Sequence, residues 1–167
     1  RMDDPRLTEA ERLLQAFPST VESLMLATLT PDGLPHASHA PFVRDDDGNF
    51  YVLVSGLSAH TGHLLANPAV AILLIEDESQ ARQVYARKRL SFDCCAETVA
   101  TDDPVRAPLL RRFRERFGEI IDVLTGLPDF VLFRLVPQSG SFVLGFGQAY
   151  RIEAPDLERL VPVRPGK

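Results

Sequence analysis

The stretch VSGLSAHTGHLLANPAVAILLI, residues 54–75, decides which fold the sequence predicts. It begins at the end of an apolar strand pattern, turns at Ser55-Gly56, and continues as a short helix pattern over residues 59–66. Asn67-Pro68 ends that helix, because the residue before a proline disfavours helical backbone, and the run AVAILLI follows. We therefore expect a strand, a sharp corner, a short helix and a second, fully buried strand.

Strand patterns dominate the rest of the chain. Those at 20–30, 35–43 and 49–55 predict an antiparallel meander, because turn sequences rich in Asp, Asn, Pro and Gly separate them. A long alternating pattern follows at 83–100, and the region 129–152 carries two closing strands. Six or seven mostly antiparallel strands with a few short helices predict a mainly β fold, an incomplete antiparallel β-barrel rather than a parallel α/β sheet.

Two helices are expected outside the corner. In the first, Thr8 and Glu11 form a capping-box pattern, and one face is apolar. That face consists of Leu7, Ala10, Leu14 and Phe17. The second helix begins at Asp103-Pro104, and its apolar face consists of Val105, Leu109, Leu110, Phe113 and Phe117.

Length and composition predict one domain. We expect residues 1–167 to form an N-terminal helix (1–20), a barrel core (21–152) and a C-terminal tail (153–167). No apolar run reaches the roughly 20 residues of a membrane span, and the N-terminus has no secretion signal, so a cytoplasmic protein is expected. A formal net charge of -5 argues against nucleic-acid binding. The adjacent Cys94-Cys95 would form a strained disulfide, so both are expected to be free thiols.

The corner gathers polar groups that suit an anion. Ser55, Ser58 and Thr61 place hydroxyls at the start of the short helix, and His60 lies among them. A helix N-terminus has unpaired N–H groups and a partial positive charge, and it attracts phosphate in particular. Ser58 alone could instead serve as a simple helix cap.

Three cations follow in the long strand pattern. Lys88 falls on the same predicted face as Leu90 and Phe92, where an unpaired charge is costly. Arg87 and Arg89 flank it on the opposite face. A phosphate or carboxylate ligand would account for these cations and for the corner hydroxyls together, whereas a strand end in water would account for the cations alone.

The histidines do not form a metal-binding pattern. His36, His39, His60 and His63 lack the HxxxH or HxH spacing and the acidic partners of a metal site, so we expect no metal and a pocket-lining role instead. The arginines of residues 106–116 are expected on a solvated helix face. No Ser-His-Asp order, phosphate-binding glycine loop or CxxC motif supports a hydrolase or a nucleotide triphosphatase.

The run FYVLVSGLSAHTGHLLANPAVAILLIEDES, with VYARKRLSF, resembles the FMN-binding split-barrel superfamily of pyridoxamine 5'-phosphate oxidase. ASHAPF, ARKRL and GFGQAY resemble its haem-utilisation (HugZ-type) branch, over residues 21–152. The resemblance implies a split β-barrel that forms a homodimer and holds its cofactor between the subunits. It places Ser58, His60 and Thr61 at a flavin phosphate, Lys88 near the flavin, and Ser38 near a phosphate-binding strand.

We therefore expect an FMN-dependent oxidoreductase, with a haem-binding or haem-degrading protein as the alternative and a barrel without cofactor as the third hypothesis. Ala59 stands where the oxidases have an arginine, which argues against vitamin B6 oxidation. Haem-binding members ligate iron through a C-terminal histidine, whereas the last histidine here is His63. No catalytic acid or base stands out. The expected cofactor-binding residues are Ser38, Ser55, Ser58, His60, Thr61, Arg87, Lys88 and Arg89.

Overall fold

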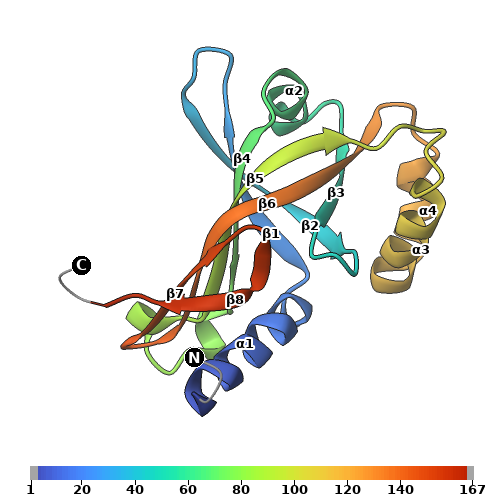
Figure 1. Cartoon of the computed structure of the whole chain (residues 1–167). Helices are drawn as coiled ribbons and strands as arrows, with labels where there is room; N and C mark the ends of the chain where they lie inside the picture. Colours follow the sequence, from blue (N-terminus) through green and yellow to red (C-terminus); the bar gives the residue numbers. More distant parts are fainter. Residues whose placement is uncertain (1–3, 165–167) are drawn as a thin grey trace.

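Six antiparallel strands close into a barrel in the computed structural model of the chain, which describes residues 4–164 (Figure 1). Their order is β3-β2-β1-β4-β5-β6, and pairing of β3 with β6 closes the ring, while β7 and β8 extend the sheet beyond β6. This confirms the predicted mainly β split barrel. The strands are β1 (Ser23–Leu29), β2 (Pro35–Arg44), β3 (Phe50–Ser55), β4 (Ala69–Ile75), β5 (Arg89–Thr98), β6 (Phe130–Gly145), β7 (Gln148–Glu153) and β8 (Asp156–Pro162).

Helix α1 (Pro5–Ala16) is followed by the short 3₁₀-helix η1 (Phe17–Thr20). The predicted apolar face of α1 is buried as expected and joins the barrel core. The predicted capping box is wrong, because Asp4 caps the helix and accepts hydrogen bonds from the backbone N–H groups of Arg6 and Leu7. Thr8 instead donates its hydroxyl to the Asp4 carbonyl oxygen at 3.1 Å.

Strand β3 is buried on both faces because two cores lie on either side of it. Phe50 and Val52 face the barrel interior, where they join a core to which all the other strands contribute apolar residues. Tyr51 and Leu53 face outward, against helices α3 (Arg106–Phe117) and α4 (Ile120–Thr125). These helices cover one side of the barrel and form its second core (Figure 1).

Two strand predictions need correction. Strand β4 is not fully buried: Val70, Ile72 and Leu74 face the interior, while the alternate residues are partly or fully exposed. The predicted strand 83–100 begins only at Arg89, because the chain first forms the 3₁₀-turns η2 (Glu78–Gln80) and η3 (Val84–Ala86). The structure therefore contradicts the prediction that the first residues of this pattern, from Val84 to Lys88, belong to a strand with one face in the core.

The C-terminal third contains more strand than expected. The two predicted closing strands are one long strand, β6, which turns back into β7, and the predicted tail contains β8. Cys94 is buried and Cys95 exposed, and both are free, as predicted. Within residues 4–164, no helix combines the length and the apolar content that crossing a bilayer requires.

Candidate functional site

The corner after β3 is fixed by hydrogen bonds to Asp129. The backbone N–H of Gly56 donates to the Asp129 carbonyl oxygen at 2.8 Å, and the Ser55 hydroxyl donates to the Asp129 carboxylate at 2.9 Å. A Cβ atom at position 56 would lie 3.0 Å from that carbonyl oxygen, which explains the glycine. Thr61, on helix α2 (Ala59–Ala66), is buried and donates its hydroxyl to the Ser55 carbonyl oxygen at 2.5 Å. Two of the predicted ligand donors therefore hold the corner itself.

Ser38 and His60 meet where β2 passes α2. Their Oγ and Nδ1 atoms are 2.8 Å apart, although the residues are 22 positions apart in the chain. Burial lowers the pKa of His60, and the positive charges that His36, His39 and His63 can carry lower it further. The imidazole is therefore kept neutral near pH 7, with Nδ1 bonded and Nε2 left for another partner.

A second hydroxyl–histidine pair lies beside the first. Thr28 of β1 is buried, and its Oγ1 lies 2.9 Å from His63 Nδ1. The rings of His36 and His63 meet edge to face, with their centroids 4.9 Å apart. The sequence analysis missed Thr28, whose signal was a hydroxyl at an inward-facing position of an apolar strand. Among the described residues, no group of three or more His, Cys, Asp or Glu is arranged to hold a metal ion.

A mostly apolar cavity of about 340 Å³ adjoins this corner, and we call it the corner cavity. Ser58, which starts α2 without a side-chain cap bond, lines it together with Ser55 and His60. The remaining walls come from β2, β3, α3, α4 and the start of β6. They include His39, Leu53, Phe113, Phe117, Ile120, Leu124 and Phe130. The sequence analysis grouped Ser55, Ser58 and His60 at the corner but did not identify this cavity or its aromatic walls.

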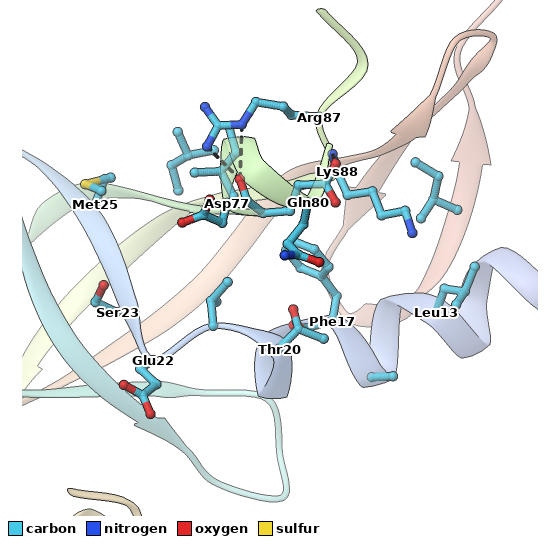
Figure 2. A pocket seen from close by; sticks show the side chains of 16 residues that line it. Leu13, Phe17, Thr20, Glu22, Ser23, Met25, Asp77, Gln80, Arg87 and Lys88 are labelled. Carbon is cyan, nitrogen blue, oxygen red and sulfur yellow. Dashed lines mark hydrogen bonds between the residues drawn. The ribbon is translucent and has the colours of Figure 1, made fainter. Parts of the chain in front are cut away.

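A larger cavity, of about 720 Å³, lies between α1, η1 and the ends of β1 and β4, and we call it the α1 cavity (Figure 2). Its apolar walls include Leu13, Phe17, Val21, Met25, Leu73, Ile75 and Leu144. Arg87 and Lys88 stand at its edge. Figure 2 shows Lys88 extending away from Arg87, toward the side of the cavity where α1 lies.

The three predicted cations have different roles. The Arg87 guanidinium donates twice to the Glu76 carbonyl oxygen, at 3.0 and 2.6 Å, and once to the Glu78 carboxylate at 3.4 Å (Figure 2). Arg89 donates to the Arg87 carbonyl oxygen at 2.9 Å. Lys88 is exposed and does not lie on a core face, which corrects the burial expected for it. Of the three cations, Lys88 is the one that lines the α1 cavity and whose ammonium bonds to no described residue.

The structure separates the predicted anion site into two parts. Ser38, Ser55, Ser58, His60 and Thr61 gather at the corner, as expected, whereas Arg87 and Lys88 line the α1 cavity and Arg89 lines neither cavity. No described residue lines both cavities. Strand β1 runs from one to the other, since Ser23 lines the α1 cavity and Thr28 contacts α2. At the usual rise of a strand, Ser23 and Thr28 are about 17 Å apart.

Residues 10–144 match the sequence profile of the pyridoxamine 5'-phosphate oxidase family. This chain belongs to that family. Over 153 residues it is 44% identical to heme oxygenase HutZ of Vibrio cholerae serotype O1, covering 92% of this chain and 86% of the relative. A crystal structure of HutZ, described as a heme storage protein, has a TM-score of 0.76 and 43% identity, covering 82% of this chain and 97% of that chain. Campylobacter jejuni ChuZ has a TM-score of 0.86 and 32% identity, covering 98% and 68%.

These relatives confirm the predicted haem-utilisation branch and overturn the predicted function. The FMN-dependent oxidoreductase is wrong as the main expectation, because HutZ, which matches nearly the whole chain, is named for haem. The FMN-binding family member from Nostoc punctiforme is 16% identical with a TM-score of 0.63, and it covers 97% of this chain and 98% of its own, which shows the fold alone. Residue 59 at the corner is an alanine, so this position offers no cation to a flavin phosphate.

Proposed function

We propose that this protein binds haem and acts in haem utilisation. The observation that carries the proposal is the 44% identity to heme oxygenase HutZ across 92% of the chain. The alternative expected from the sequence, a haem-binding or haem-degrading protein, thereby becomes the main hypothesis. The name of that relative makes oxidative cleavage of haem the reaction to test once binding has been measured.

The α1 cavity has the chemistry that haem requires. Haem is a flat, largely apolar macrocycle with two propionate carboxylates on one edge, so its site needs apolar walls and a cation at the rim. The α1 cavity supplies both, through the side chains around Leu13 and Phe17 and through the ammonium of Lys88. Its lining also includes the acidic residues Glu22, Glu76 and Asp77, so Lys88 is the group of this rim that can meet a propionate. Its volume of about 720 Å³ lies in the range of cofactor sites. Bound haem would supply the oxygen and electron chemistry, and the protein would supply orientation and exclusion of water.

We also infer that two copies form the complete site. The outward face of β1, β2 and β4 carries small apolar side chains at its centre, because Ala27 pairs with Ala37 on one side and with Ala71 on the other. Met25 continues this face and is 48% exposed. An apolar sheet face of this kind suits a second copy of the chain. A two-fold axis that runs across the strands reverses the ends of the face, so in that arrangement the α1 cavity of one copy would face the corner cavity of the other.

This arrangement would bring the two parts of the predicted site together. Lys88 of one subunit would meet the propionates, and a histidine at the corner of the partner would be available to the iron. His60 suits that role best, since its Nδ1 is bonded to Ser38, which leaves Nε2 for the iron, and the residue lines the corner cavity. The cytoplasmic location expected from the sequence belongs to the same proposal, supported by the two free cysteines.

Titration of the purified apo-protein with hemin tests the proposal, with FMN titrated in parallel. We expect a shifted Soret band with hemin and no response to FMN. Lys88→Ala should weaken hemin binding about two- to fivefold, because an exposed ion pair contributes less than about 1 kcal/mol. Arg159→Ala is the matched control, since Arg159 is exposed and pairs only with Asp156 on β8. Binding of FMN without binding of hemin would reject the proposal.

The subunit arrangement is tested by Ala27→Arg, which places a charge in the middle of the apolar face. We expect a monomer by light scattering and weaker hemin binding together. Val123→Arg, on the exposed side of α4, is the control and should leave both unchanged. A dimer that survives Ala27→Arg with full hemin affinity would refute this interface.

A further inference from the structure

Two exposed aromatic side chains stand at the end of the barrel that carries the α1 cavity. Tyr85 on η3 is 87% exposed, and Phe146 in the turn between β6 and β7 is 73% exposed. Aromatic rings stabilise a protein by being buried, so two rings left in water at one end of the barrel mark a surface that binds something. Figure 1 shows the η3 segment and the β6–β7 turn at the same end of the barrel, beyond α1.

Both rings lie close in sequence to residues that line the α1 cavity, although neither ring is itself among the lining residues. The register of β5 on β6 pairs Arg89 with Val143, and η3 packs against β6. The next residues outward, Lys88 and Leu144, both line the α1 cavity. Tyr85 and Phe146 follow within three residues on the two sides, so they flank the part of the rim that carries the free cation.

The segment that carries Tyr85 is fixed at its base. The backbone N–H of Glu76 donates to the Lys88 carbonyl oxygen at 2.9 Å, and the backbone N–H of Lys88 donates to the Glu76 carboxylate at 2.8 Å. The Arg87 guanidinium adds its two bonds to the Glu76 carbonyl oxygen. The two ends of the segment 76–88 are therefore held together before any ligand binds. Tyr85 would then lose less conformational entropy when it binds a ligand.

We propose that Tyr85 and Phe146 form an aromatic rim that packs against the face of a flat macrocycle seated in the α1 cavity. The inference rests on the proposed haem-binding function and adds the residues that distinguish haem from other amphipathic anions. Lys88 meets the carboxylate edge, and the two rings meet the porphyrin face. A second copy of the chain is the other occupant to consider, but neither ring lies on the β1, β2 and β4 face assigned to the subunit contact.

Hemin titration of Tyr85→Ala, Phe146→Ala and the double variant tests the rim. We expect each single change to weaken binding roughly tenfold, and the induced circular dichroism of the Soret band to fall. Tyr85→Phe and Phe146→Tyr keep the rings and should bind as the wild type does. Val123→Ala removes another exposed apolar side chain, 61% exposed, from α4 outside both cavities, and is the matched control.

The outcomes separate this inference from the proposed function. If the wild type binds hemin and the alanine variants bind it equally well, the rim is refuted while haem binding stands. If the wild type does not bind hemin, the proposed function itself fails. If the double variant becomes monomeric in the absence of hemin, the rings belong to a subunit contact and the inference is overturned. Far-ultraviolet circular dichroism of each variant excludes misfolding as the cause of lost binding.

Discussion

Gly140 is the position at which a single methyl group should cost most. It lies in the middle of β6, between Phe92 of β5 and Ile152 of β7. A Cβ atom there would lie 2.4 Å from the Ser91 carbonyl oxygen and 2.5 Å from a ring carbon of Phe92. Phe92 is buried in the barrel core and cannot swing away.

The expected cost follows from this crowding. Overpacking of a core costs about 1–3 kcal/mol, and the upper end applies because a backbone oxygen is involved. A loss of about 3 kcal/mol corresponds to a melting temperature lower by about 6–12 °C in a chain of this size. Gly140→Ala should therefore unfold at a much lower urea concentration than the wild type, as followed by far-ultraviolet circular dichroism.

Gly62→Ala is the matched control, because the same chemical change is made where there is room. Gly62 lies on α2, and a Cβ atom there would have no neighbour within 4 Å. Alanine is the better helix former, so this variant should be more stable by about 0.5–1 kcal/mol. If both variants shifted the urea midpoint in the same direction by the same amount, the close contact of β5 with β6 at Gly140 would be refuted.

Two further predictions concern titratable groups. Because the pKa of His60 is lowered in the folded state, the unfolded chain binds more protons, so stability should fall as the pH drops below about 6.5. Urea unfolding at pH 7.5 and 5.5 measures this loss, and His60→Gln should reduce the difference between the two; an unchanged difference would contradict the assignment. Burial raises the pKa of Cys94 to about 12, whereas Cys95 is exposed. A thiol reagent at pH 7.5 should therefore modify one cysteine of the native chain and two in urea, and rapid labelling of both without urea would contradict the burial of Cys94.

The segment from β3 to β4 could be predicted because its signals are local. The apolar strand, Gly56 at the corner and Asn67-Pro68 after α2 each determine the backbone within a few residues. The start of β5 could not be predicted in this way. The alternation of apolar and polar residues extends back from β5 to Val84 and so predicts a longer strand. Arg87, however, binds the Glu76 carbonyl oxygen, and this contact across eleven residues bends the chain before β5 begins.

The site was predicted in part for the same reason. The corner hydroxyls cluster in sequence, so their proximity was visible. The contacts of Ser38 with His60 and of Thr28 with His63 join different strands to α2 across 22 and 35 residues, and no periodicity indicates them. The apparent break near Pro137 concealed the continuity of β6, because a register shift between β5 and β6 accommodates the proline.

Closure of the barrel by β3 and β6 has a consequence for synthesis. Phe50 pairs with Leu135, so β3 leaves the ribosome long before its closing partner does. Until then β3 exposes an apolar, unpaired edge, which is a template for pairing with other nascent chains. Native contacts between such distant residues also form slowly. Production at low temperature, or with abundant chaperones, should therefore raise the yield of this protein more than it would for a helical protein of equal size.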